Sequence, residues 1–420
     1  MSKVVKANYT AEAVAGFTHR TALEEAARCL LCHDAPCSQG CPAGTDPARF
    51  IRSIRFRNVK GAAETIRENN VLGGSCARVC PYDRLCEEAC SRCGIDKPIQ
   101  IGKLQRYAIE QEEIFGMKTL EAPAEKKAGK IACVGAGPAS LACAAELAKA
   151  GYVVTVFERE AKAGGVLTYG IVPSRLPQEV VDHDIDQVKG LGVEFVFNKE
   201  VKAADLEDYY AVFIGTGLWK DNLPEIEGID KKGVYAAVDY LKAARSGQAG
   251  FDAGKRVVVV GGGDVTTDCA VTAKLLGAED VKIVYRRTIE EAPGNIEEFH
   301  YALSLGIGVT TGMAPEAILG DDAMTGVLFK GFYDKDAEMK VSADTIVFAT
   351  GQKAEDMSAI ADVKLDDRKG LIVAEDGKAG GKFFAAGDIV NGGKTVVEAV
   401  AEGKEAAASM IAYLEEKGVK

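Results

Sequence analysis

The sequence predicts an α/β chain in which an N-terminal helical, cysteine-rich domain precedes two Rossmann-like domains, the second inserted in the first. Three observations predict this fold class. Nine of the 12 cysteines lie between Cys29 and Cys93. Two apolar runs each lead into a glycine-rich turn, within residues 131–140 and 257–266. After residue 129, short apolar runs and amphipathic stretches alternate as they do in βαβ units.

Composition shifts along the chain indicate where the domains begin and end. Residues 21–28 are good helix formers that lead into Cys29, and residues 122–129 are a polar, small-residue linker. Each later half also has a second apolar run that ends in Thr-Gly. The expected domains are therefore a helical domain at 1–121, a first nucleotide-binding domain at 129–245 and 350–420, and a second at 250–349.

Charge and hydropathy exclude several classes of protein. The 420 residues carry a formal net charge of −11 and contain no Lys/Arg-rich block, which argues against nucleic-acid binding. No apolar stretch reaches the roughly 18 residues that cross a bilayer, and residues 1–16 lack the apolar core of a signal peptide. We therefore expect a cytoplasmic protein with no membrane partner. In that compartment a dense cysteine group indicates metal binding rather than disulfides.

The spacing of the first cysteines is close to that of bacterial ferredoxins. Cys29, Cys32 and Cys37 are followed by Cys41-Pro42, and in ferredoxins the cysteine before proline ligates the other of two clusters. A second group supplies ligands from a distant segment: Cys76, Cys80, Cys86, Cys90 and Cys93. Two interleaved groups predict two [4Fe–4S] clusters. Structural zinc and plain buried thiols are the alternatives, and the Cys-Pro pairs favour iron–sulfur.

The first glycine-rich turn has the features of a dinucleotide site. Gly135 allows a tight turn, and Gly137 lets the backbone approach a pyrophosphate at the start of a helix that begins with Pro138 and Ala139. Glu158 follows the next predicted strand, 23 residues after Gly135, where a carboxylate accepts hydrogen bonds from a ribose.

A segment near the C-terminus completes this site. Gly387-Asp388 follows a short apolar run, and a helix is expected to begin near Thr395 and Val397. A carboxylate in this place can bind a ribityl hydroxyl, while the helix N-terminus faces the flavin. The first turn and this segment together predict FAD.

The second glycine-rich turn predicts a nicotinamide nucleotide site, with Gly261, Gly263, Asp264, Val265 and Thr266 as its contacts. The following strand ends at Arg286-Arg287, and no carboxylate occupies the position of an NAD-selective acid. An arginine pair can instead meet the 2′-phosphate of NADPH. The alternative is that the pair stacks on the adenine or faces solvent. Thr350-Gly351 ends a later strand and is expected at the same site.

These motifs resemble those of the flavoprotein subunit of bacterial dihydropyrimidine dehydrogenase. The chain is also similar to the N-terminal half of the single-chain enzyme and to the small subunit of glutamate synthase. The resemblance runs from Cys29 to the C-terminal helix, and Ile101-Gly-Lys-Leu-Gln105 matches the dihydropyrimidine dehydrogenases, whereas glutamate synthase small subunits have Glu at the last position. Cys76 and Cys93 have no role in this pattern.

The resemblance assigns ligands to both clusters and further contacts to the flavin. It implies that one cluster is held by Cys29, Cys32, Cys37 and Cys90, and the other by Cys41, Cys80, Cys86 and the side-chain oxygen of Gln105. It implies flavin contacts from Gly165, Leu167 and Arg175.

The implied activity is that of an electron-input subunit, which oxidises NADH or NADPH through FAD and passes electrons through the clusters. NADH is favoured, because bacterial flavoprotein subunits commonly use it and because acids follow Arg287 where a further basic residue would suit NADPH. No acid–base catalytic residue is expected, since the chemistry belongs to the cofactors.

A partner subunit is also expected. Pyrimidine reduction needs its own flavin site, in something like a barrel of about 250 residues, and the chain has no room for one. The resemblance therefore implies an FMN-containing partner that reduces uracil or thymine. The alternatives are an electron-input subunit for glutamate synthase or ferredoxin, and a non-enzymatic scaffold with vestigial cofactor sites.

Overall fold

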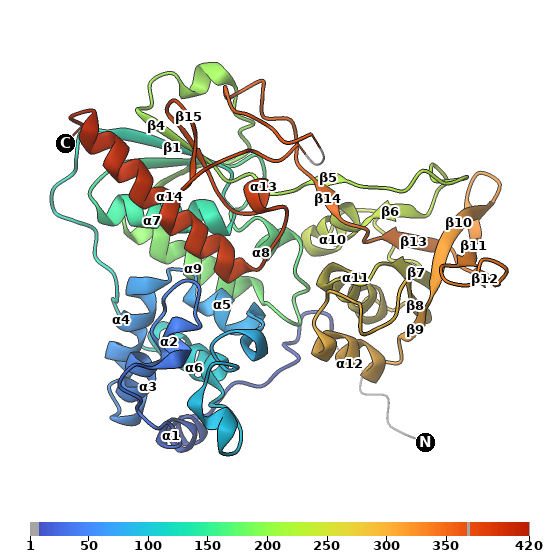
Figure 1. The fold of residues 1–420 in the computed structure, drawn as a ribbon, viewed down its shortest axis with the longest axis horizontal. Helices are drawn as coiled ribbons and strands as arrows, with labels where there is room; N and C mark the ends of the chain where they lie inside the picture. The colour runs from blue at the N-terminus through green and yellow to red at the C-terminus, as the bar shows by residue number, and fades with distance from the viewer. Residues whose placement is uncertain (1–7, 368–369, 420) are drawn as a thin grey trace. The chain divides into compact units, whose positions relative to one another are not determined.

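The computed structural model describes residues 8–367 and 370–419 (Figure 1). The chain forms two compact units. The first contains Trp219–Lys353, Tyr169–Pro177 and the described part of Met1–Ala13. The second contains Val14–Thr168, Gln178–Leu218 and the described part of Ala354–Lys420.

The cysteine-rich region of the second unit is helical, as the sequence predicts. Its core is built from side chains that are almost completely buried, including Phe50, Ile54, Ile66, Leu104 and Tyr107. Short helices with loops between them leave the cysteines at helix ends and in turns. The helices are α1 (His19–Ala27), α2 (Pro36–Gln39), α3 (Pro47–Arg55), α4 (Val59–Asn69), α5 (Gly73–Val79), η1 (Tyr82–Arg84), η2 (Ser91–Gly94) and α6 (Ile101–Ile114).

The rest of the second unit is a Rossmann-like layer around a six-stranded sheet of order β15-β16-β4-β1-β2-β3. All neighbours pair in parallel except β15 and β16. α14 packs along α7 (Figure 1). The strands are β1 (Lys130–Val134), β2 (Val153–Phe157), β3 (Glu194–Val196), β4 (Ala211–Ile214), β15 (Lys378–Gly380) and β16 (Phe383–Ala385); the helices are α7 (Pro138–Lys149), α8 (Val166–Tyr169), α9 (Gln178–Gly190), η3 (Ala203–Leu206), α13 (Asp388–Asn391) and α14 (Val396–Glu416).

The first unit has a five-stranded parallel sheet of order β6-β13-β7-β8-β9. Its strands fall between β4 and β15 in the sequence, which confirms the predicted insertion. They are β6 (Val234–Ala236), β7 (Arg256–Val260), β8 (Asp280–Tyr285), β9 (Gly308–Thr311) and β13 (Thr345–Phe348), with helices α10 (Ala237–Ser246), α11 (Asp264–Leu275) and α12 (Ile296–Ser304). An antiparallel sheet of β10 (Met313–Gly320), β11 (Met324–Gly331) and β12 (Glu338–Ser342) and the short pair β5 (Lys220–Asp221) and β14 (Gln352–Lys353) complete the unit.

A buried charge cluster joins the cysteine-rich helices to α9 of the Rossmann-like layer, which we call the flavin-type domain because it contains the first glycine-rich turn. The Arg67 guanidinium is fully buried and donates to Glu112 Oε2 at 2.7 and 2.9 Å and to Asp184 Oδ1 at 2.5 Å. Asp184 also accepts the backbone N–H of Gly74 and Ser75. Since these two residues lie in the first turn of α5, the same cluster fixes the helix that carries Cys76 and leads to Cys80.

No helix within residues 8–367 and 370–419 has both the length and the apolar character needed to span a bilayer.

Candidate functional site

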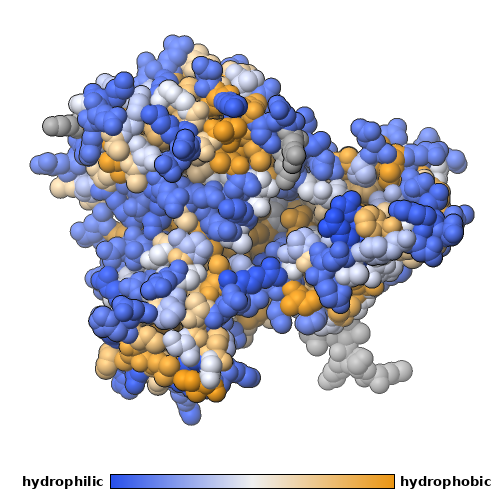
Figure 2. All heavy atoms as spheres, viewed as in Figure 1, coloured by the Kyte–Doolittle hydropathy of each residue, from blue (hydrophilic) through white to orange (hydrophobic). Residues whose placement is uncertain are grey.

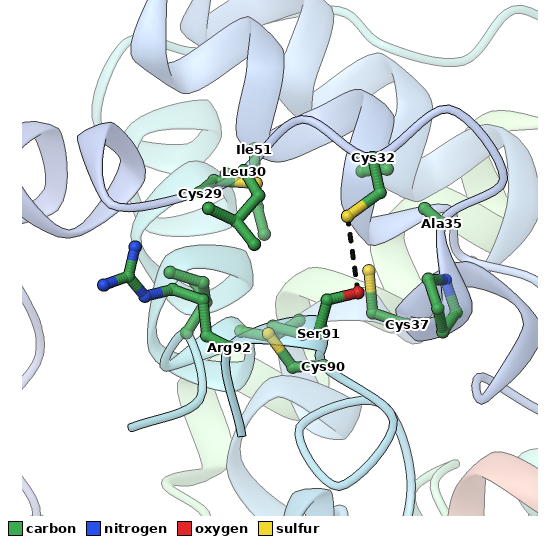
Figure 3. A pocket seen from close by; sticks show the side chains of 13 residues that line it. Cys29, Leu30, Cys32, Ala35, Cys37, Ile51, Cys90, Ser91 and Arg92 are labelled. Carbon is green, nitrogen blue, oxygen red and sulfur yellow. Dashed lines mark hydrogen bonds between the residues drawn. The ribbon is translucent and has the colours of Figure 1, made fainter. Parts of the chain in front are cut away.

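The first group of cysteines surrounds one pocket. Cys29 follows α1, Cys37 lies in α2 and Cys90 precedes η2. Figure 3 shows their side chains and that of Cys32 around a common space. The lining of the pocket includes these four cysteines and the apolar side chains of Ile51, Ile99 and Ile101.

The donor set of this pocket is that of an iron–sulfur cluster, because four cysteine thiols line it. Burial raises the pKa of Cys29, and it raises the pKa of Cys37 to about 11. A bound metal would supply the positive charge that keeps such thiols ionised at neutral pH.

A second group of thiols lies deeper in the same helical region. A hydrogen bond with Cys76, burial, and the neighbouring thiols of Cys86 and Cys41 raise the pKa of Cys80 well above its usual value. Burial, with further contributions from Glu87 and Cys41, raises the pKa of Cys86. The structure therefore brings Cys41, Cys80 and Cys86 together. The backbone N–H of Thr45 points at Cys41 Sγ at 3.5 Å, a donor of the kind that tunes cluster sulfurs.

Gln105, the expected oxygen ligand, lies on α6 and is buried. Its Nε2 donates to the carbonyl of Gly73 at 2.8 Å, which orients the amide and leaves Oε1 as the atom able to act as a ligand. Cys93 lies outside both groups: it is exposed, and its sulfur is 3.3 Å from the carbonyl oxygen of Glu87. Sequence reasoning gave Cys76 no role. Its i,i+4 spacing from Cys80 in a helical stretch is the signal that could have placed the two thiols together.

The first glycine-rich turn connects β1 to α7. Gly135 has φ = +87°, and a Cβ there would lie 2.9 Å from the carbonyl oxygen of Gly215, so a side chain is excluded. Gly137 is the N-cap of α7, and the space around it is nearly empty, since a Cβ would have only the Gly215 oxygen within 4 Å, at 3.8 Å. Pro138 and Ala139 form the first turn of the helix. This open helix N-terminus fits a pyrophosphate.

Glu158 stands at the end of β2, beside that turn. Its carboxylate is buried and accepts the backbone N–H of Ala136 at 2.8 Å and of Glu160 at 2.9 Å. Burial raises its pKa, although these two hydrogen bonds oppose the shift. Each oxygen keeps a lone pair for a ribose hydroxyl.

Replacing Glu158 by Gln should weaken FAD binding by about tenfold to a hundredfold, because an amide cannot accept all of these hydrogen bonds. The flavin-to-protein absorbance ratio after dialysis measures the loss. Glu160→Gln, two residues along and more exposed, is the matched control and should keep its flavin. Equal flavin retention in both variants would contradict the assignment.

The C-terminal segment meets the same edge of the sheet. Asp388 begins α13 directly after β16, and its Oδ1 accepts the N–H of Lys394 at 3.3 Å. Burial raises the pKa of Asp388. Thr395 caps α14 through a capping box with Glu398, and Val397 is buried in the first turn of that helix. The other predicted contacts in this unit are Gly165, whose φ is +54°, the fully buried Leu167, and Gly387, whose N–H donates to Glu402.

The second glycine-rich turn connects β7 to α11. Gly263 is the N-cap of α11, and a Cβ built on it would meet no atom within 4 Å, so this helix N-terminus is also open. Thr266 is fully buried, and its hydroxyl has no hydrogen-bond partner among the described residues. Asp264 begins α11, and its Oδ1 accepts the N–H of Asn295 at 2.6 Å. Gly261 precedes the turn, and Val265 packs partly into the core.

The remaining predicted contacts of the first unit differ in exposure and in their hydrogen-bond and ion-pair partners. Arg286 and Arg287 follow β8 and are exposed. Thr350 uses its hydroxyl to donate to the carbonyl of Asn222 at 2.8 Å, and Gly351 follows with φ = +101°. Arg175, expected at the flavin, is 3.1 Å from the Glu298 carboxylate and 3.6 Å from that of Asp268.

Replacing Arg286 by Ala should lower the affinity for NADPH by about tenfold more than that for NADH, if its guanidinium meets the 2′-phosphate. Equilibrium titration of the anaerobic protein with both oxidised nucleotides measures the two affinities. Equal losses would instead identify an arginine that stacks or faces solvent.

The glycine turns, the buried carboxylates and the two thiol groups agree with comparisons to known proteins. Residues 6–116 match the family described as dihydropyrimidine dehydrogenase domain II, 4Fe-4S cluster, and residues 129–403 match the pyridine nucleotide-disulphide oxidoreductase family. In solved structures the fold is similar to that of FprA from Mycobacterium tuberculosis in complex with NADPH. That match has a TM-score of 0.61 at 19% identity and covers 69% of this chain and 86% of the other.

Two curated relatives match almost end to end. The NAD-dependent dihydropyrimidine dehydrogenase subunit PreT of Escherichia coli K12 is 45% identical over 97% of this chain and 98% of its own. The glutamate synthase [NADPH] small chain of the same strain is 33% identical over 95% of this chain and 93% of its own. The protein is therefore an NAD(P)H-dependent flavin and iron–sulfur oxidoreductase. It belongs to the pyridine nucleotide-disulphide oxidoreductases that carry an N-terminal dihydropyrimidine dehydrogenase-type iron–sulfur domain, the family that includes PreT.

Proposed function

We propose that this chain is the electron-input subunit of a dihydropyrimidine dehydrogenase. It oxidises NADH, and its FAD and two [4Fe–4S] clusters pass electrons to an FMN-containing partner subunit that reduces uracil or thymine to the 5,6-dihydropyrimidine. The observation that carries the proposal is the presence of two separate thiol groups in the same compact unit as the flavin-type turn. The 45% identity to an NAD-dependent subunit supports the choice of substrate and nucleotide.

Bound flavin supplies the change from two-electron to one-electron chemistry, and the chain supplies binding and orientation. The N-terminus of α7 would hold the pyrophosphate, Glu158 a ribose and Asp388 the ribityl chain. Cys29, Cys32, Cys37 and Cys90 would hold one cluster, and Cys41, Cys80, Cys86 and Gln105 the other. The Arg67 cluster keeps the helix that leads to Cys80 fixed against the flavin-type domain.

Exposed apolar side chains around the first pocket support a protein partner at that place. Leu30 lines the pocket and is 47% exposed. Phe56, 69% exposed, follows Arg55, whose guanidinium donates to the carbonyl of Cys29. Figure 2 shows hydrophobic side chains gathered over the region that Figure 1 labels α1 and α3. A protein surface with large exposed apolar groups of this kind suits a docking partner.

Isolation of the chain from its native cells under anaerobic conditions, with whatever co-purifies, tests the proposal. We expect a second, flavin-containing subunit, and NADH oxidation that starts when uracil or thymine is added. NADH oxidation that does not respond to pyrimidines, but starts when glutamine and 2-oxoglutarate are added, would identify a glutamate synthase small subunit instead. That second candidate is supported by the 33% identity to such a subunit over 95% of the chain.

A further inference from the structure

We infer that Glu291 selects NADH over NADPH, by binding the adenosine ribose and repelling a 2′-phosphate. The inference rests on the proposed function, because it requires that this chain oxidises a nicotinamide nucleotide at the turn between β7 and α11. It assigns nucleotide selection to an acid that lies six residues beyond the end of β8.

The loop that carries Glu291 folds back onto the glycine-rich turn. A Cβ built on Gly262 would lie 2.5 Å from the ring of Tyr285, so this ring covers the turn. The Tyr285 hydroxyl donates to the backbone oxygen of Glu291 at 3.2 Å. The N–H of Gly294 donates to the carbonyl of Gly262 at 3.0 Å. Glu291 is therefore held beside the end of β8, where Rossmann domains bind the adenosine ribose.

Its carboxylate is oriented but still accessible. Oε2 accepts the hydroxyl of Tyr333 at 2.5 Å and the N–H of Thr288 at 3.1 Å. Oε1 remains as an acceptor for a ribose hydroxyl, and the residue is exposed. The hydrogen bonds from Tyr333 and Thr288, with a smaller contribution from Arg287, lower the pKa of Glu291. The group is thus ionised at neutral pH.

Two cations near this loop face an aromatic ring. The Arg286 guanidinium lies 5.7 Å from the centroid of the Phe332 ring, and the Lys335 ammonium lies 5.2 Å from the same centroid. Arg287 is close enough to Glu291 to influence its ionisation. These three cations would suit a 2′-phosphate if the carboxylate were absent. With the carboxylate in place, a doubly charged phosphate meets a fixed negative charge.

The test is Glu291→Gln in the FAD-loaded, cluster-containing protein. It keeps the side-chain length and one acceptor oxygen but removes the charge. Steady-state kcat/KM for NADH and for NADPH, with ferricyanide as acceptor, gives the preference of each protein. We expect the wild type to prefer NADH, and the variant to shift that preference towards NADPH by about tenfold. Glu290→Gln, the adjacent exposed acid, is the matched control and should leave the ratio unchanged.

The outcomes separate this inference from the proposed function. A ratio that Glu291→Gln does not move, or that Glu290→Gln moves equally, would overturn the role of Glu291 while leaving the proposed function intact. A wild type that prefers NADPH would overturn both the role of Glu291 and the choice of NADH in the proposed function, and would leave electron input to a partner subunit in place. Failure of both nucleotides to reduce the wild-type flavin would overturn the proposed function itself.

Discussion

Replacing Arg67 by Met should lower the free energy of unfolding by about 3–5 kcal/mol, the typical result of removing one partner from a buried ion pair. The guanidinium forms ion pairs with two carboxylates at once, Glu112 and Asp184, and both of these side chains are fully buried. Without it, two acids would remain in a dry environment and repel each other. Urea denaturation of the anaerobically purified protein, followed by circular dichroism, measures the change.

The decrease in the free energy of unfolding caused by Arg67→Met should become smaller at low pH. Burial alone would raise the pKa of Glu112, but the hydrogen bond from His183 and the charge of Arg67 outweigh burial and hold it at about 2, below the usual 4.5. A depressed carboxyl pKa contributes stability that is complete above the unfolded value and is lost as pH falls through the folded value. The difference between wild type and Arg67→Met should therefore narrow as pH falls from about 4.5 towards 2.

Arg49→Met is the matched control. Arg49, like Arg67, pairs with a glutamate. Its partner is Glu68 at 3.5 Å, and both side chains of this pair are more than 60% exposed. Exposed pairs contribute about 0–1 kcal/mol. If Arg67→Met cost no more than Arg49→Met, the buried cluster would not be what holds α5 against the flavin-type domain.

Replacing Cys41 by Ala should remove one of the two clusters and leave FAD in place. About half of the iron should be lost, since the resemblance assigns Cys41 to the group that contains Cys80 and Cys86 and the structure brings these three thiols together. The flavin turn lies in a different part of the same unit and uses none of these sulfurs. Iron analysis, flavin absorbance and electron paramagnetic resonance of the reduced protein measure the three quantities.

Two further variants test whether the loss of iron is specific to the cluster that Cys41 is expected to bind. Cys93→Ala should keep all of the iron, because Cys93 is exposed and its sulfur lies against the carbonyls of Glu87 and Glu88. Cys29→Ala should also lose about half of the iron, but from the other cluster, with a different spectrum remaining. Unchanged iron in Cys41→Ala would show that Cys41 is not a ligand, and Cys76 would be the thiol to test next.

Local patterns in the sequence predict the parts of this fold that depend on short-range rules. Apolar runs before the two glycine turns predict β1 and β7, and the turns themselves predict α7 and α11, because strand, turn and helix follow within about ten residues. The cysteine spacing predicts two clusters, whereas the division of the thiols into two ligand groups comes from the family resemblance. The antiparallel sheet of β10 to β12 is not among the expectations, although the turn at Gly320-Asp321-Asp322 between β10 and β11 is typical of a hairpin.

Long-range contacts could not be predicted. Arg67 lies on a helix where an arginine would normally face solvent, and its partner Asp184 is 117 residues away. Likewise, Tyr333 contacts Glu291 across 42 residues, so the sequence around the arginine pair gives no sign that a tyrosine orients the acid. Both contacts are between side chains that only the tertiary fold brings together.

The most direct test of the central claim is an anaerobic titration of the purified chain with NADH, followed by optical and electron paramagnetic resonance spectra. If electrons enter at the flavin and continue into two [4Fe–4S] clusters, the flavin band should bleach and the signals of reduced iron–sulfur centres should appear, with about eight irons per chain by analysis. A protein that binds flavin but holds no iron, or whose clusters stay oxidised while the flavin is reduced, would contradict the account.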